Sequence, residues 1–215
     1  MYARFWKRVL DFLISLLALA ILSPILLLLT LIGAVAMRGN PFFTQRRPGR
    51  GEKIFRLIKF RTMSNKRDAS GNLLPDEQRL NGYGRFLRST SLDELPELLN
   101  IFVGQMAIVG PRPLLPSYLP LYSEEQRHRH DVRPGLTGYA QVHGRNAVDW
   151  EERFRLDVWY TQHITLRQDV RILFDTVRVV LKRDGIGSGT SETMKPFTGS
   201  KVGVPTEAVQ EAKVE

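Results

Sequence analysis

The feature that most constrains this chain is an uncharged, strongly apolar segment that runs from Phe12 to Met37. As a helix it would be about 39 Å long, which is enough to cross a hydrocarbon layer of about 30 Å. It is longer than the apolar region of a signal peptide, which has about 7–15 residues, and no convincing cleavage site follows it. The sequence therefore predicts a segment that stays in the mature protein and enters a membrane.

Two features bear on how the segment enters the membrane. Ser23-Pro24 lies near its middle, where proline removes a backbone donor and clashes with the carbonyl one turn earlier. Cations flank the segment on both sides, and positively charged flanks prefer the cytoplasmic face. A helix-break-helix hairpin keeps both flanks on that face, whereas a single kinked span does not. The residues alone leave these two arrangements open.

Four residues of this region are expected to meet lipid headgroups: Lys7, Arg8, Ser23 and Pro24. The two cations precede the apolar segment, where long basic side chains reach toward headgroup phosphates. Asp11 follows them by one helical turn, so an ion pair at the membrane surface is the alternative for Lys7 or Arg8.

The charge balance predicts an anionic partner. The net charge is +9 and the isoelectric point about 10.1, which suits nucleic acid, lipid headgroups or a phosphorylated substrate. The chain has 0 cysteines, which excludes disulfides and thiolate chemistry. It lacks G-x-x-x-x-G-K-S/T, G-x-G-x-x-G and H-E-x-x-H motifs, so P-loop, dinucleotide and zinc enzymes are disfavoured. His128 and His130 lie in the basic stretch "QRHRHDVR" and are expected on a solvated face.

The soluble part is expected to be α+β and mainly helical. Two β-prone runs flank the turn residues Pro48–Gly51, which predicts a hairpin over 42–63. Further along we expect a polar loop over 64–75, a helix beginning at 89–91, irregular structure over 109–116 and helical structure over 119–131. A loop over 133–146 and helices over 150–163 and 166–183 follow. The last helix has an apolar face and a largely basic opposite face. That pattern fits both a helix on an anionic membrane surface and an ordinary core-facing helix.

The stretch "STSLDELPELLN", Ser89–Asn100, places Asp93 and Glu94 side by side at this expected helix start. A hydroxyl from the serine–threonine run would cap the helix, and the helix dipole would favour ionised acids. Simple capping explains such a pair by itself. Because neighbouring side chains on a helix point about 100° apart, separate roles suit the acids better than a matched dyad. One could attack a substrate while the other holds a cation, and two hard oxygen ligands suit Mg²⁺.

Cations able to hold phosphate recur along the chain. The set comprises Lys59, Arg61, Arg88, Arg112, Arg133 and Arg145. Three of them, in "GPRP", "RPG" and "GRN", adjoin proline or glycine, which restrict or sharply turn the backbone. A guanidinium held in this way can bind a diphosphate through two parallel hydrogen bonds. The pattern favours a phosphorylated substrate.

Together these motifs resemble those of the small monotopic phosphoglycosyl transferases, bacterial enzymes that begin glycoconjugate assembly on polyprenyl phosphate. The resemblance runs from about Lys7 to Gly199. It rests on the order and spacing of "KRVLD", the Ser23-Pro24 break, "FFTQRRPGRG", "IKFRTM", "SLDELPELLN", "VGPRP", "RPGLTGYAQVHGRN" and "TSETMKPFTG". The last stretch is similar to that of members acting on UDP-N,N′-diacetylbacillosamine in protein glycosylation.

The resemblance implies transfer of a phospho-sugar from a UDP-sugar to polyprenyl (undecaprenyl) phosphate, with release of UMP. On matching positions it makes Asp93 the nucleophile that forms a covalent phospho-sugar intermediate, and it makes Glu94, with Asp93, a ligand of Mg²⁺. The residues expected to place the substrates are Lys59, Arg88, Arg112, Arg133, Arg145 and Asp157. The resemblance also implies a monotopic protein of the bacterial inner membrane, with a re-entrant helix and its active site on the cytoplasmic face.

The expected organisation is a re-entrant membrane helix over 1–38, a catalytic domain at the cytosolic interface over 39–199 and a disordered tail over 200–215. Compared with larger relatives, the chain is expected to be the minimal catalytic unit. Two alternatives stay open: direct lipid attack in a ternary complex with both acids on the metal, and a membrane-tethered basic protein without catalysis. The expected partners are the UDP-sugar, polyprenyl phosphate and membrane phospholipids, without nucleic acid. Whether the chain forms a homo-oligomer is left open.

Overall fold

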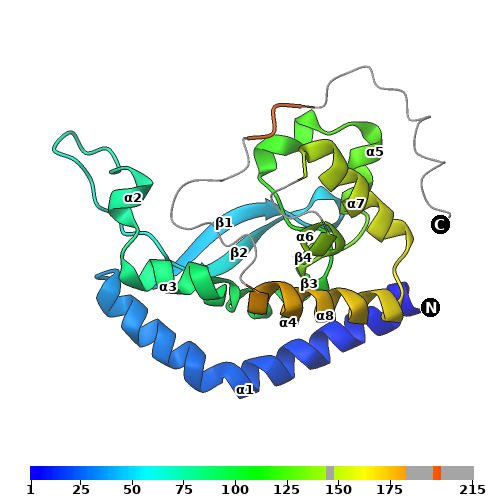
Figure 1. The fold of residues 1–215 in the computed structure, drawn as a ribbon, viewed down its shortest axis with the longest axis horizontal. Helices are drawn as coiled ribbons and strands as arrows, with labels where there is room; N and C mark the ends of the chain where they lie inside the picture. The colour runs from blue at the N-terminus through cyan, green and yellow to red at the C-terminus, as the bar shows by residue number, and fades with distance from the viewer. Residues whose placement is uncertain (144–147, 183–195, 200–215) are drawn as a thin grey trace.

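The computed structural model describes residues 1–143, 148–182 and 196–199. Within them the protein is mainly helical with two small two-stranded sheets, which agrees with the expected α+β class. Figure 1 shows the long N-terminal helix α1 along one side of the molecule, with the other elements gathered on the opposite side. The expected tail over 200–215 lies outside the described residues.

Helix α1 (Lys7–Ala36) continues from a single π-helical turn over Tyr2–Trp6. In the part of the chain that the structure describes, this stretch alone is long and apolar enough to cross a membrane, judged by length and composition. Pro24 lies within α1, and Figure 1 shows the helix bent near its middle, with both ends turned toward the rest of the molecule. Because proline removes a backbone hydrogen bond and crowds the preceding turn, we attribute the bend to Pro24. The break predicted at Ser23-Pro24 is a bend in one continuous helix.

The first cation of α1 does not point to lipid headgroups. Lys7 is buried, and its Nζ lies 2.6 Å from Oδ2 of Asp169, which belongs to α8 (Leu166–Lys182). Tyr2 donates to the same oxygen at 2.6 Å, and Tyr160 donates to Oδ1 at 2.6 Å. The headgroup prediction is wrong for Lys7 because Asp169 offers it a desolvated, hydrogen-bonded partner. This pair ties α1 to α8.

Arg8 and Asp11 also face the protein and hold α1 against its neighbours. Arg8 donates to the carbonyl oxygens of the last two residues of α4 (Glu97–Phe102), at 2.7 and 2.8 Å. Since the last carbonyls of a helix have no partner within it, Arg8 caps α4 from outside and is not directed to headgroups as predicted. Asp11 accepts a 3.0 Å bond from the Ile108 backbone, so its hydrogen bond goes to the protein core and not to the neighbouring cations.

The predicted hairpin is present. Strands β1 (Phe42–Pro48) and β2 (Ile54–Phe60) pair antiparallel along their whole length. Asn100 of α4 meets the other edge of β2, where its side chain accepts from Ile58 N–H at 3.0 Å and donates to the Arg56 carbonyl at 2.8 Å. Because this one amide satisfies two backbone groups of an edge strand, it fixes α4 against the hairpin.

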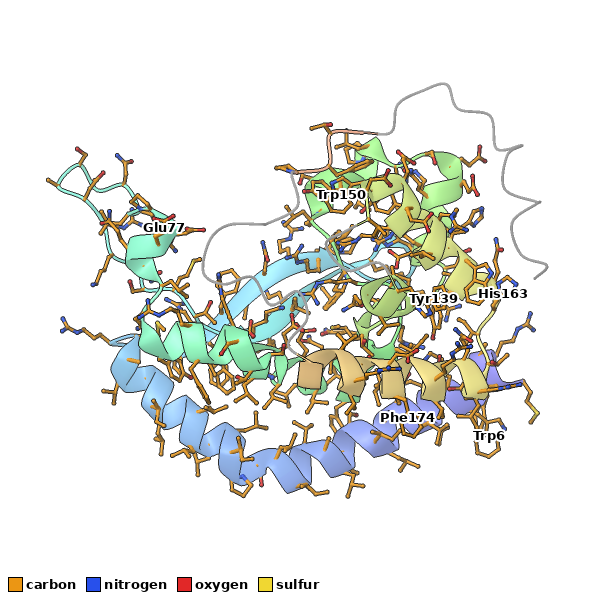
Figure 2. The ribbon with its side chains drawn as sticks, viewed as in Figure 1. Trp6, Glu77, Tyr139, Trp150, His163 and Phe174 are labelled. Atoms are coloured by element: carbon orange, nitrogen blue, oxygen red, sulfur yellow. The ribbon has the colours of Figure 1, made fainter. Side chains whose placement is uncertain are left out.

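Residues 64–75 form the predicted polar loop and lead into α2 (Asp76–Arg79). Figure 1 shows the loop and α2 as an arm that projects from the body of the molecule, and Glu77 marks this arm in Figure 2. The chain returns to the body at α3 (Gly82–Thr90). The Asn81 side chain caps the first turn of α3 by accepting a 2.8 Å hydrogen bond from a backbone N–H.

The acid pair does not open a helix, so the start predicted at 89–91 is wrong. Ser91 ends α3 in a left-handed conformation with φ 56, and the acids follow in a single 3-10 turn over Leu92–Glu94. Thr90 donates its hydroxyl back to the Phe86 carbonyl, as hydroxyls inside a helix do. The serine–threonine run therefore closes one helix and caps no other. Helix α4 begins after Pro96.

The loop predicted over 133–146 contains regular structure in its described part. Strand β4 (Gly135–Thr137) pairs in parallel with β3 (Ala107–Val109), and α6 (Tyr139–His143) follows β4. Strands this short give no alternating apolar pattern, so the sequence did not reveal them.

The helical structure predicted over 119–131 is broken into separate pieces. This region contains the 3-10 turns Pro116–Leu121 and His128–His130, with helix α5 (Glu124–Arg127) between them. Another 3-10 turn, Arg50–Glu52, lies between the two hairpin strands. Ser123 starts α5 with a reciprocal capping box. Helix α7 (Trp150–Gln162) and α8 match the two helices predicted at the end of the catalytic domain.

Helix α8 has one buried and one uncovered apolar side. Ile172 is fully buried in the main core between α1, α4, the hairpin and α7. Exposed on α8 are Leu166, Val170, Phe174, Val177 and Val180. Phe174 is 72% exposed, and in Figure 2 it lies on the side of the molecule that also carries Trp6 and α1. The core-facing interpretation is therefore confirmed for the side that carries Ile172, and the membrane-surface interpretation stays a prediction for the exposed apolar side.

We expect Asp169→Asn to lower the midpoint of thermal unfolding by about 6–12 °C. The change leaves the buried Lys7 without its ion-pair partner, which costs about 3 kcal/mol, at about 2–4 °C per kcal/mol for a chain of this size. Differential scanning fluorimetry of the detergent-solubilised protein measures the shift. Asp175→Asn on the same helix is the matched control, since Asp175 has no ion pair within the described ranges. A midpoint within about 2 °C of this control would contradict the role assigned to Asp169.

Candidate active site

The turn that carries the two acids is fastened to the membrane helix by the leucines beside it. Leu92 and Leu95 pack against a buried cluster that includes Leu29 of α1. The turn and α1 therefore share a hydrophobic core. As a result, Asp93 and Glu94 lie next to the long apolar helix, at the junction of α3, α4 and β2.

Glu94 is the centre of an ion-pair network. Its Oε1 accepts from Arg112 at 2.6 Å and from Lys59 at 2.8 Å. Lys59 Nζ also lies 2.9 Å from Oε1 of Glu97, a buried carboxylate at the start of α4. Burial raises the pKa of Glu94, but the charges and hydrogen bonds of Arg112 and Lys59 outweigh it and lower this pKa to about 2. Glu94 is therefore a permanent anion that orients two cations.

The surroundings of Asp93 differ from those of Glu94. It is half-buried, and no group in the described part of the chain donates a hydrogen bond to it. Burial and the Glu94 charge raise the pKa of its carboxyl, while Lys59, Arg112 and Arg88 oppose the rise. The helix dipole predicted to favour ionised acids gives little support here, because the 3-10 helix that begins at this turn has only 3 residues. An unpartnered, poorly solvated carboxylate is available to attack an electrophile, whereas Glu94 is engaged.

Arg112 holds Glu94 and still faces solvent. Its side chain is 38% exposed, and the Glu94 charge raises its pKa, so it is charged and accessible to an anion. Its loop is fixed from behind, because Arg129 donates to the Arg112 carbonyl at 2.8 Å. Arg129 is itself buried against Asp157 at 2.6 Å. Asp157, predicted to place substrate, thus lies behind the Arg112 loop, where it contacts neither acid.

The structure brings some of the predicted phosphate-binding cations to the acid pair. Lys59 and Arg112 contact Glu94 directly. Arg88 donates to Thr62 Oγ1 at 3.1 Å, and its charge acts on the pKa of Asp93. These three cations surround the acids, which is a suitable environment for a diphosphate.

Two further predicted cations are not part of this cluster as described. Arg133 donates to the Gly104 carbonyl at 2.8 Å and contacts neither acid. Arg145 lies outside the described residues. The assembled part of the predicted site is therefore the acid pair with Lys59, Arg88 and Arg112.

The sequence analysis did not identify three residues that position the site: Glu97 and Asn100 of α4, and Arg129 of the stretch "QRHRHDVR". Glu97 follows Glu94 by three residues, a spacing at which side chains on a helix are neighbours, and this was the available signal. Asn100 and Arg129 act through backbone carbonyls of distant segments. No local pattern marks such contacts.

The acid pair can contribute to a magnesium site but does not form one alone. Within residues 1–143, 148–182 and 196–199, no group of three or more His, Asp or Glu side chains gathers in a metal-binding arrangement. Asp93 keeps free oxygens, and the hydrogen bonds to Glu94 engage Oε1. Protein-bound Mg²⁺ commonly uses one or two carboxylates together with substrate phosphates. The two acids fit that donor set, with an anionic substrate needed to offset Lys59 and Arg112.

Comparison with known proteins gives a consistent answer. The family model described as bacterial sugar transferase matches residues 2–183. An uncharacterized sugar transferase, EpsL of Bacillus subtilis, is 48% identical over 90% of this chain and 96% of that protein. The undecaprenyl-phosphate galactose phosphotransferase of Salmonella typhimurium is 38% identical over 85% of this chain but 42% of that protein.

A third relative is the UDP-glucose:undecaprenyl-phosphate glucose-1-phosphate transferase of Caulobacter vibrioides, 38% identical over 83% of this chain and 70% of that protein. The chain therefore spans nearly all of one relative and less than half of another. The sugars in these names differ, so they do not test the predicted sugar. The match over most of the chain shows, as the resemblance predicted, that this protein belongs to the bacterial sugar transferase family of phosphoglycosyl transferases.

Proposed function

We propose that this protein transfers a phospho-sugar from a UDP-sugar to polyprenyl phosphate, in bacteria undecaprenyl phosphate, and releases UMP. The observation that carries the proposal is the contrast between the acids: Asp93 is unpartnered and poorly solvated, whereas Glu94 is held by two cations. The Salmonella typhimurium and Caulobacter vibrioides relatives are both named for undecaprenyl phosphate. The "TSETMKPFTG" stretch supports UDP-N,N′-diacetylbacillosamine or another N-acetylated sugar, although most of it lies outside the described residues.

In the proposed reaction, an Asp93 carboxylate oxygen attacks the phosphorus that carries the sugar. The bond from this phosphorus to the bridging oxygen of the diphosphate breaks, and UMP leaves with the electron pair. The acyl phosphate so formed links Asp93 to the phospho-sugar, and no proton has to move. An oxygen of the lipid phosphate then attacks the same phosphorus and restores the carboxylate. One difficult displacement is thereby divided into two.

The charged neighbours of Asp93 have distinct tasks in this scheme. Arg112 and Lys59, oriented by Glu94, neutralise the diphosphate as charge moves toward the leaving UMP. Arg88 approaches Asp93 from α3. Asp93 and Glu94 would hold Mg²⁺ together with substrate oxygens, and the ion would add further charge neutralisation.

We place the protein in the bacterial inner membrane as a monotopic protein, with α1 re-entrant and the site on the cytoplasmic face. Support comes from the bend of α1, whose two ends turn toward the body of the molecule (Figure 1). Ser23 and Pro24, at this bend, are exposed; with both ends of α1 at the cytoplasmic face they would lie at the deepest point of the helix, among the acyl chains and not at the headgroups first expected for them. The uncovered apolar side of α8 adds a second surface suited to lipid. This arrangement brings a membrane-anchored lipid phosphate to a site beside α1.

We expect the wild-type enzyme to exchange labelled UMP into the UDP-sugar in the absence of lipid acceptor. A covalent intermediate makes the first half-reaction reversible by itself, whereas attack in a ternary complex requires the lipid. A panel of UDP-sugars, scored by UMP release with undecaprenyl phosphate and Mg²⁺, first identifies the donor. Active enzyme that shows no exchange with this donor would exclude the covalent route.

Asp93→Asn is expected to abolish both exchange and transfer without loss of folding. Since the folded-state pKa of Asp93 is raised, the ionised carboxylate costs the fold stability at neutral pH. The variant should therefore unfold at the same or a higher temperature than the wild type. Unchanged transfer by a folded Asp93→Asn protein would refute the proposed nucleophile and would reopen the non-catalytic alternative.

The rate of exchange, as kcat/KM, should fall as the pH is lowered, with an inflection above the usual aspartate value of about 3.9. Attack requires the ionised Asp93, and burial raises its pKa; Glu94 stays ionised throughout. Burial raises the pKa of Glu97 as well, so Glu97→Gln is the control and should retain the inflection. Loss of the inflection in this control would assign it to Glu97.

The topology can be tested with single cysteines, because the natural chain has 0 cysteines. Ala3→Cys and Asn40→Cys lie at the two ends of α1, and both positions are exposed. A membrane-impermeant thiol reagent should label neither variant in intact cells or spheroplasts and both after permeabilisation. Labelling of one of the two from outside would indicate a full span.

A further inference from the structure

A large cavity lies apart from the acid pair. Its volume is about 860 Å³, it is open to solvent, and it is lined by the hairpin turn, the loop between α4 and β3, and the segment before β4. This volume is within the range of small-molecule sites, about 300–1,000 Å³. Neither Asp93 nor Glu94 contributes to its described lining. The reaction proposed above therefore leaves it without a role.

Basic side chains dominate the charge of this cavity. Arg50, Lys53 and Arg133 line it, and none of them forms an ion pair with a carboxylate among the described residues. Asp131 is an acid in the lining, but its Oδ2 lies 2.9 Å from Nδ1 of His128. The cations thus outnumber the acids in a partly enclosed space, where like charges repel more strongly than in water.

A fourth cation approaches the same loop from α1. The Gly104 carbonyl accepts from Arg133 at 2.8 Å, and a Cβ on Gly104 would lie 3.0 Å from Nη2 of Arg8. Gly104 has φ +88, a conformation that favours glycine, and its lack of a side chain lets the Arg8 guanidinium approach the loop that Arg133 also binds. Burial first, then the charges of Arg8 and Arg50, lower the pKa of Arg133. The Asp11 charge partly offsets these effects, but Arg8, Arg50 and Arg133 form no ion pair with a carboxylate of the described residues.

His130 is a lining residue whose ring is buried. It was expected on a solvated face, but it is 5% exposed and packs against the Tyr122 ring. Its buried Nε2 has no hydrogen-bond partner in the part of the chain that the structure describes. Buried polar groups are rarely left unpaired in native proteins. Because this nitrogen is shielded from solvent, an entering ligand would meet the cations of the lining and not His130 Nε2.

We propose that this cavity is a second anion site, separate from Asp93, which binds a phosphate ester. Arg50, Lys53 and Arg133 would hold the phosphate oxygens, since guanidinium and ammonium groups form strong charge-assisted hydrogen bonds with them. The ester is either the phosphodiester headgroup of an anionic membrane lipid or a soluble phosphate monoester. Its binding would reinforce the loop that Arg8 and Arg133 share, next to the capped end of α4. This site does not depend on the proposed transfer reaction.

Hydrogen–deuterium exchange of the full chain tests the site with two probes. Glycerol 3-phosphate added to detergent-solubilised protein represents the soluble source. Nanodiscs of phosphatidylglycerol, compared with phosphatidylcholine alone, represent the lipid source. Either probe should slow exchange in peptides that cover 49–55 and 130–133. Protection by glycerol 3-phosphate supports a soluble ligand, and protection by phosphatidylglycerol alone supports a headgroup.

Matched charge variants distinguish binding in this cavity from general electrostatic attraction to a basic protein. Arg50→Gln/Lys53→Gln removes two lining charges and should weaken binding about tenfold or more, equivalent to about 1.4 kcal/mol. Arg46→Gln/Arg56→Gln removes two exposed charges from the same hairpin outside the cavity and should change binding less than about twofold.

Two results would overturn the proposal. One is the absence of protection at both peptides with either probe in the wild type, which decides the question even if a variant fails to fold. The other is equal weakening by the two double variants, which would indicate unspecific charge attraction.

Discussion

Helix α4 is the element on which the other parts of the structure depend. Arg8 of α1 caps its last carbonyls, Asn100 joins its middle to β2, and Glu97 at its start meets Lys59. A helix of 6 residues has little stability by itself, so these outside contacts determine where it lies. The acid turn directly precedes α4. The contacts that join the membrane helix to the hairpin therefore also fix the position of Asp93.

The two neighbouring acids acquire different properties from this arrangement. Glu94 faces two cations and is kept ionised, whereas Asp93 faces burial and the Glu94 charge. Nothing in the residue types distinguishes them, since an aspartate and a glutamate are chemically alike. The difference arises because the 3-10 turn directs their side chains into separate surroundings. One carboxylate orients cations, and the other keeps free oxygens.

Buried charges recur away from the acids, and each joins segments far apart in the sequence. Lys7 and Asp169 connect the first and last described helices, and Arg129 and Asp157 support the Arg112 loop. Breaking such pairs is costly because it leaves one charge desolvated. They therefore specify which segments meet. The basic cavity differs, because its cations Arg50, Lys53 and Arg133 form no ion pair with a carboxylate of the described residues.

Local patterns in the sequence were sufficient to predict α1 and its irregularity at Pro24, the hairpin, α7 and α8, because their apolar periodicity and turn residues are local properties. The same patterns selected the acid pair and the cations Lys59, Arg88 and Arg112. Tertiary structure decided what local patterns do not contain. It turned Lys7 and Arg8 inward, made Ser91 a helix end, paired β3 with β4 and separated Arg133 from the acids, since each depends on a partner far along the chain. The sequence by itself determined which groups are available for chemistry; the tertiary structure decided which of them are desolvated together, and hence which carboxylate is free to react.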